Sequence, residues 1–97
     1  MCDYAGEVGT FGYAVFYAKQ GQKVAREGWN GSGMFAFIVP ANKYPIERNS
    51  SSPLKGMFED DMVPYRAYWA LKTAQNDVAA WSPSGSDSIA EDWYVVD

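Results

Sequence analysis

A glycine-rich segment, Gly28 to Gly33, constrains the fold of this chain more than any other feature. It contains Asn30-Gly31, a strong signal for a two-residue β-hairpin turn, because both turn positions need positive φ. The flanking segments 23–27 and 34–39 have strand character, and the second is so apolar that we expect both of its faces to be covered. The sequence therefore predicts an antiparallel hairpin with Trp29 and Asn30 at its tip.

A helix is predicted before this hairpin. Thr10 is a suitable N-cap residue, and Gly21 is a suitable residue to stop the helix. Between them, apolar residues recur at i, i+3, i+4 and i+7. These residues are Phe11, Ala14, Val15 and Ala18. Such a stripe predicts a helix packed on the sheet of the same domain.

A second, aromatic stripe of Tyr13, Phe16 and Tyr17 lies on a different face of the predicted helix. An aromatic face left in water indicates a surface for a partner. The alternative is that the two tyrosines keep their hydroxyls in water at the edge of the core. The residues alone leave both interpretations open.

The rest of the chain alternates between loops and strands. Residues 41–64 carry three prolines and three consecutive serines, so they are expected to form a long inserted loop, and residues 1–9 are expected to be a flexible start. Further strands are predicted at 65–73, 78–81 and 93–96, with one helical turn at 87–90. The pattern predicts a single α+β domain over 1–97, with one N-terminal helix packed on a small antiparallel sheet of about five strands, and an oligomer that covers the remaining apolar surface.

Composition excludes several classes of function. The net charge of −4 argues against a general DNA or RNA binder, and no apolar run approaches the length of a membrane span. The chain has one cysteine and no histidine, so it lacks an intrachain disulfide, a Ser–His or Cys–His pair and the commonest metal ligand. We expect no metal, no cofactor, no nucleic-acid partner and no membrane partner.

The hairpin tip carries two candidates for ligand binding. Trp29 suits stacking on a nucleobase, although packing in the core against Trp93 or Trp81 explains it equally well. Arg26 suits bidentate binding of a phosphate, or alternatively an ion pair with Glu27 or Glu91.

Polar residues further along the chain offer additional candidates. Lys72 and Thr73 could add a charge and a hydroxyl to the same pocket, or could be an exposed strand end. Asp92 could accept hydrogen bonds from ribose hydroxyls, or could be part of a solvated turn with Glu91. A hydrolase that uses Asp87, Glu91 or Asp92 is conceivable, but neither a nucleophile nor a base accompanies these carboxylates.

Four segments together resemble one protein family. They are 23–34 (KVAREGWNGSGM), the helix end Gln20-Gly21, 71–74 (LKTA) and 89–96 (IAEDWYVV). In their order along the chain, these segments resemble the second type of Thoeris anti-defence protein, a small phage and bacterial family. The resemblance covers most of the chain. This chain departs from the simpler family pattern in the long segment 41–64 and in the polar segment 82–86.

The resemblance implies a molecular sponge in the cytoplasm of the infected bacterial host. Such proteins form homotetramers that bind cyclic nucleotide immune signals between subunits without cleaving them. The implied ligands are glyco-cyclic ADP-ribose isomers and, in some members, cyclic dinucleotides of cyclic-oligonucleotide defence. A nucleotide hydrolase and a phage structural module that binds other proteins are the alternatives.

The resemblance also implies roles for six residues of this chain. Trp29 would stack on the ligand and Asn30 would recognise its polar groups. Arg26 and Lys72 would contact phosphate. Thr73 and Asp92 would contact phosphate or ribose.

Overall fold

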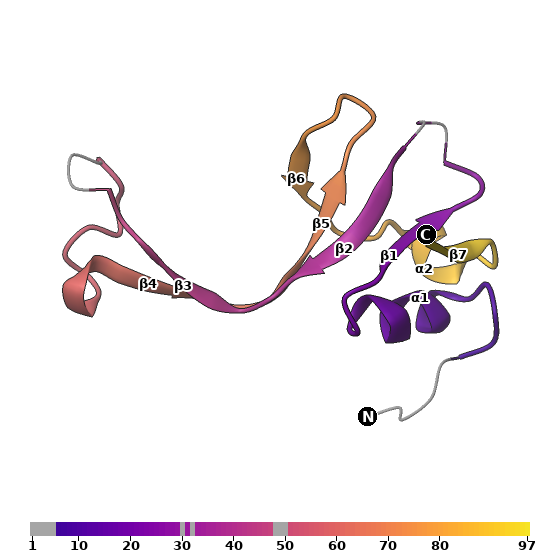
Figure 1. Cartoon of the computed structure of the whole chain (residues 1–97), viewed down its shortest axis with the longest axis horizontal. Helices are drawn as coiled ribbons and strands as arrows, with labels where there is room; N and C mark the ends of the chain where they lie inside the picture. The colour runs from indigo at the N-terminus through magenta and orange to yellow at the C-terminus, as the bar shows by residue number, and fades with distance from the viewer. Residues whose placement is uncertain (1–5, 30, 32, 48–50) are drawn as a thin grey trace.

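The computed structural model describes residues 6–29, 31, 33–47 and 51–97. Its body is a five-stranded antiparallel sheet in the order β6-β5-β2-β1-β7, with helix α1 (Phe11–Ala18) packed against it (Figure 1). The strands are β1 (Lys23–Arg26), β2 (Phe35–Val39), β5 (Tyr68–Lys72), β6 (Val78–Ala80) and β7 (Trp93–Val96). The predicted α+β class, with an N-terminal helix on a five-stranded antiparallel sheet, is confirmed.

Helix α1 begins where its capping residue predicts. The Thr10 side chain accepts a hydrogen bond from the backbone N–H of Tyr13 at 3.2 Å, which satisfies one free donor of the first turn. The helix ends at Ala18, and Gly21 follows with φ +89°. Positive φ costs glycine little, so the chain reverses there into β1. Ala14 and Ala18 are buried, and their small side chains let the helix lie close to the sheet.

The core lies between α1 and one face of the sheet. It is built around Ala14, Ala18, Val24, Ala36 and Trp93. Val24 lies opposite both Ala36 and Val95 in the sheet, and directly opposed residues share a face. On the opposite face of β2, Phe35, Phe37 and Val39 are half-buried, so the expectation of two covered faces holds only in part within one chain.

The connection between β1 and β2 is longer than predicted. Eight residues, 27–34, separate the end of β1 from the start of β2, and Asn30 of the predicted turn lies outside the described residues. The backbone N–H of Glu27 donates to the carbonyl oxygen of Asp92 at 3.1 Å, and that of Gly28 to its carboxylate at 2.9 Å. These donors are therefore taken by a segment distant in sequence instead of by the facing strand.

The segment expected to be a long loop forms a second ladder. Strands β3 (Asn42–Pro45) and β4 (Met62–Tyr65) pair antiparallel and, with the 3₁₀ helix η1 (Glu59–Asp61), form an arm that projects from the body (Figure 1). The register continues that of β2 and β5, because Val39 lies opposite Tyr68 and Asn42 opposite Tyr65. The prediction of a loop is wrong for these residues. A two-stranded ribbon consists of two edge strands, and edge strands tolerate proline because one side of each needs no hydrogen-bond donor.

The chain ends fold onto the same core. Residues 1–5 of the expected flexible start lie outside the described part, whereas Gly9 is buried and its carbonyl oxygen accepts a hydrogen bond from the N–H of Trp93 at 2.9 Å. Helix α2 (Gly85–Ile89) begins two residues before the predicted helical turn. No described helix is long and apolar enough to cross a membrane.

Candidate functional site: a loop held by an arginine and two aspartates

Arg26 is the last residue of β1, where the candidate loop begins. Its Nε donates to Oδ1 of Asp92 and its Nη1 to Oδ1 of Asp87, both at 2.8 Å. The ion-pair interpretation of Arg26 is therefore the one that the structure shows, but with these two carboxylates in place of Glu27 or Glu91. A guanidinium offers five donors in a fixed plane, and here two of them bind the chain's own acids.

Asp87 connects four parts of the site. It is the third residue of α2 and forms a capping box with Ser84, in which each residue's side chain accepts from the other's backbone N–H at 3.0 Å. Its Oδ1 also lies 3.4 Å from the indole nitrogen of Trp29, and its carbonyl oxygen accepts from the indole N–H of Trp93 at 2.9 Å. Only 8% of Asp87 is exposed, so these contacts take the place of water.

The ion pairs set the charge of all three groups. The hydrogen bond from Arg26 lowers the pKa of Asp92, with further help from the Gly28 N–H, and the same bond raises the pKa of Arg26. Burial pushes the pKa of Asp87 upward, but hydrogen bonds from Ser84, Arg26 and Trp29 outweigh it, and the net shift is downward. Both carboxylates are consequently ionised at neutral pH.

Trp29 packs against two other tryptophans. Its ring meets Trp93 edge-on at a centroid distance of 5.4 Å and 78°, and Trp81 at 6.0 Å and 77°. Edge-to-face pairs of this kind are favourable because the ring edge is positive and the ring face negative. Of the two interpretations of Trp29, the core contact is present in the structure, and the half-buried ring keeps part of its surface in solvent.

Lys72 and Thr73 lie at the other end of the same loop. Lys72 ends β5, and its Nζ donates to the carbonyl oxygen of Gly33 at 3.3 Å. The Thr73 hydroxyl donates to the carboxylate of Asp77 and accepts from the N–H of Gln75, which closes the turn before β6. A methyl group placed on Gly31 would lie 3.0 Å from the Cβ of Ala74, so the loop touches this turn.

Five of the six predicted site residues thus fall into two groups. Arg26, Trp29 and Asp92 meet at the first part of the loop, and Lys72 with Thr73 lies at its second part. Asn30 lies outside the described residues. Asp87, which joins the first group, is not among the predicted ligand-binding residues, and the sequence suggests it only as a hydrolase carboxylate. The pattern Ser84-x-x-Asp87 before an apolar residue was the signal of a helix cap that could have placed it.

Comparison with known proteins gives the family. The model of the Tad2-like family, described as the Thoeris anti-defense 2-like domain, matches residues 9–96. This chain belongs to that family. It is 36% identical over 87 residues to Thoeris anti-defense 2 of Bacillus phage SP01, which covers 90% of this chain and 93% of the relative. The family resemblance carried by segment 23–34 is confirmed, and membership supports a function in phage against Thoeris defence.

Proposed function

We propose that this protein counters Thoeris defence by binding a cyclic nucleotide signal and holding it uncleaved. The observation that carries the proposal is the match to Thoeris anti-defense 2 over nearly the full length of both chains. The proposed ligands are glyco-cyclic ADP-ribose isomers, with cyclic dinucleotides as a second class. The proposed working form is a homotetramer in the cytoplasm of the infected host.

The geometry of loop 27–34 supports tight binding. Asp92 and Arg26 hold its first residues, and Lys72 holds Gly33 near its end. Loop ends that are held before the ligand arrives lose less conformational entropy on binding, so more of the interaction energy appears as affinity. In this proposal Arg26 and Asp92 hold the loop in place, while Lys72 contacts phosphate.

The remaining contacts in the proposal come from the loop and the adjacent turn. Trp29 and Asn30 bind the base, the first through the solvent-facing part of its ring, and Thr73 binds phosphate or ribose. Recognition of this kind combines stacking with charge-assisted hydrogen bonds.

The state of the two aspartates favours binding over hydrolysis. A carboxyl group that donates a proton near neutral pH needs a raised pKa. The pKa values of Asp87 and Asp92 are lowered, and both groups are occupied by Arg26. The pair therefore suits a structural role in a binding protein better than general acid catalysis.

The direct test is recovery of intact ligand. Purified protein is mixed with glyco-cyclic ADP-ribose or a cyclic dinucleotide, the bound fraction is separated and heat-denatured, and the released material is analysed by chromatography. The proposal expects depletion of the free ligand and release of unchanged molecules. Altered product would indicate a hydrolase. If neither ligand is depleted, the result would favour the alternative of a module that binds other proteins.

A further inference from the structure

The indole ring of Trp29 can sit against Trp81 and Trp93 in two orientations. The second side-chain torsion of an aromatic residue has a broad, roughly two-fold preference, so a half-turn keeps the plane of the ring and moves its nitrogen to the other side. The edge-to-face contacts with Trp81 and Trp93 depend on that plane. The partner of the indole N–H is therefore what distinguishes the two orientations.

Asp87 is the partner of both indole N–H groups in this pair of rings. Its Oδ1 accepts from Nε1 of Trp29 at 3.4 Å, and its carbonyl oxygen accepts from Nε1 of Trp93 at 2.9 Å. The two rings meet at 78° with their centroids 5.4 Å apart. One residue of α2 thus holds both rings, the first through its side chain and the second through its backbone.

The carboxylate of Asp87 is itself held on both of its oxygens. Oδ2 accepts from the backbone N–H of Ser84 at 3.0 Å, and Oδ1 accepts from Nη1 of Arg26 at 2.8 Å. The residue is only 8% exposed, so water does not readily replace these donors. The carboxylate cannot turn without losing a hydrogen bond, and it is therefore a fixed acceptor for the indole of Trp29.

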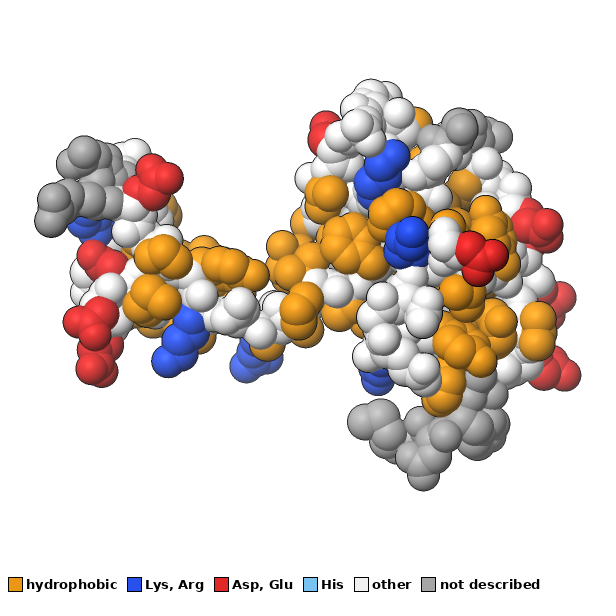
Figure 2. Space-filling view, in the orientation of Figure 1, with side chains coloured by type: hydrophobic (Ala, Val, Ile, Leu, Met, Phe, Trp, Pro, Cys, Tyr) orange, Lys and Arg blue, Asp and Glu red, His pale blue; other side chains and the backbone are white. Residues whose placement is uncertain are grey.

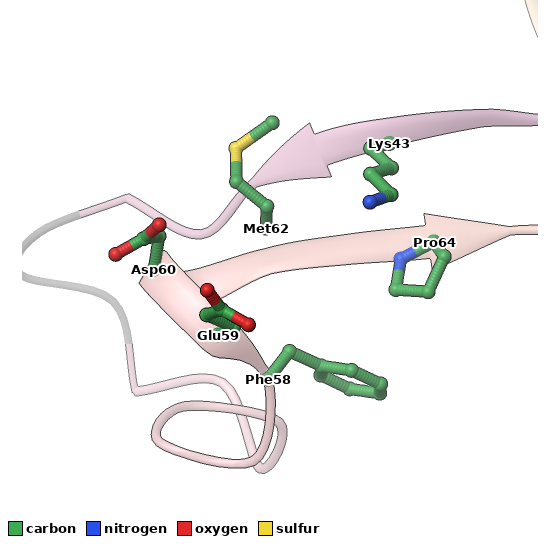
Figure 3. Close-up of a pocket in the computed structure, with 6 residues that line it drawn as sticks. All are labelled: Lys43, Phe58, Glu59, Asp60, Met62 and Pro64. Carbon is green, nitrogen blue, oxygen red and sulfur yellow. The ribbon is translucent and has the colours of Figure 1, made fainter.

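The arm lies on the other side of the body from α2 and β7 (Figure 1). Hydrophobic side chains follow the arm on the face shown in Figure 2, and its outer part carries a hollow of about 370 Å³ (Figure 3). The charged residues at this hollow, Lys43, Glu59 and Asp60, are exposed. Within one chain, the orientation of Trp29 accordingly depends on α2 and β7, which contact it, and not on the arm.

We propose that Asp87 is a positioning residue for ligand binding, which holds the ring of Trp29 in the orientation whose solvent-facing part receives the base. The inference rests on the proposed function, because that function supplies the ligand that Trp29 contacts. Asp87 is buried, so it acts through Trp29 instead of touching the ligand. A ring that is oriented before the ligand arrives loses less side-chain entropy on binding.

A double-mutant cycle tests whether Asp87 acts through Trp29. An amide has one acceptor oxygen, so Asp87→Asn cannot serve Ser84 on one side and Trp29 with Arg26 on the other. Its affinity for glyco-cyclic ADP-ribose is expected to fall about 10-fold, the effect of one hydrogen bond to a charged group. Trp29→Phe keeps an aromatic ring without the indole N–H, and adding Asp87→Asn to it should cause little further loss. An equal loss in both backgrounds would overturn the proposal.

Ser84→Ala is the matched control for a weakened helix α2. It removes the hydroxyl that accepts from the N–H of Asp87 at 3.0 Å, but it keeps the donors to both carboxylate oxygens. Urea denaturation is expected to show reduced stability, whereas the affinity for the ligand should stay near that of the unsubstituted protein. If Ser84→Ala lost as much affinity as Asp87→Asn, the effect would follow from loosening of α2 and the proposal would be overturned.

The indole N–H signals in a ¹H–¹⁵N NMR spectrum report the orientation of Trp29 without any ligand. Four such signals are expected, one for each tryptophan, and Trp29→Phe identifies the signal of Trp29. Asp87→Asn should move this signal upfield, because the hydrogen bond to a charged acceptor is lost, and should move the other three less. Ser84→Ala should leave it in place.

The spectrum also separates this inference from the proposed function. If the signal of Trp29 moves in Asp87→Asn but the unsubstituted protein binds no cyclic nucleotide, the hydrogen bond that positions Trp29 is supported and the proposed function is overturned. If the unsubstituted protein binds the nucleotide but the signal does not move, the positioning role is overturned and the proposed function is retained.

Discussion

The guanidinium of Arg26 and the carboxylate of Asp87 lie 2.8 Å apart although they are 61 positions apart in the chain. Their contact joins the end of β1 to the helix that precedes β7. Asp92 completes the arrangement from the other side of the guanidinium and also holds the N–H of Gly28. Three charged groups therefore determine where the candidate loop leaves the sheet.

Asp87→Ala is expected to destabilise the protein by about 2–3 kcal/mol, because it removes a helix cap and a hydrogen bond to a charged group. Urea denaturation followed by tryptophan fluorescence measures the loss. Ser88→Ala changes an exposed neighbour in the same helix and should stay close to the unsubstituted protein. Equal stability of the two variants would show that the contacts of Asp87 make no net contribution to the free energy of unfolding.

Acid should weaken the fold through Asp87 and Asp92. The pKa values of Asp87 and Asp92 are lower in the folded than in the unfolded chain, so their contribution is complete above the ordinary aspartate pKa of about 3.9. It is lost as the pH falls through the lower folded values. The urea midpoint is therefore expected to decrease below about pH 4.5, and the decrease should be smaller in Asp87→Ala. An identical pH dependence in both proteins would contradict the assignment.

Gly9→Ala is expected to cost about 2–5 kcal/mol, from a left-handed backbone and a steric clash. Gly9 has φ +95°, and a methyl group there would lie 2.4 Å from the carbonyl oxygen of Glu91. Gly21→Ala is the matched control, because Gly21 has φ +89° and nothing within 4 Å of its added methyl group. The difference between the two unfolding free energies isolates the clash. No difference would mean that the turn at 6–9 moves freely away from Glu91.

Lys72→Met is expected to weaken binding of the proposed ligand about 10- to 100-fold, the effect of losing one hydrogen bond to a charged phosphate. Calorimetric titration with glyco-cyclic ADP-ribose measures the change. Lys19→Met removes an exposed lysine at the end of α1, away from the loop, and should bind as the unsubstituted protein does. Equal affinity of both variants would remove Lys72 from the ligand contacts.

Several features of the fold were predictable because local rules govern them. Thr10 and the spacing of Phe11, Ala14 and Ala18 predict α1, since capping and amphipathic period act within a few residues. The strands around residues 24, 36 and 94 follow equally from short apolar runs. The predicted turn at Asn30-Gly31 lies partly outside the described residues. The hydrogen bonds from Glu27 and Gly28 to Asp92 could not be predicted, because turn rules consider only neighbouring residues and Asp92 is distant in sequence.

The arm shows a different limit of sequence interpretation. Pro45 and Pro64 argue against a central strand, and with Pro53 and the serine run they predict a loop over 41–64. In a two-stranded ribbon each strand is an edge, and Pro64 lies opposite Lys43 without disrupting the ladder. Proline therefore restricts the position of a strand within a sheet more than the existence of the strand.

The sequence by itself determined the helix, the approximate positions of the five body strands along the chain and, through four segments that resemble it, the family. Only the tertiary structure decided the partners of the site residues. Arg26 could pair with any nearby acid or with a ligand, and Trp29 could face solvent or the core. The choice of Asp87, Asp92 and the Trp81–Trp93 pair depends on how α2 and β7 pack beside β1, because contacts between segments this distant in sequence are set by tertiary packing and not by local patterns.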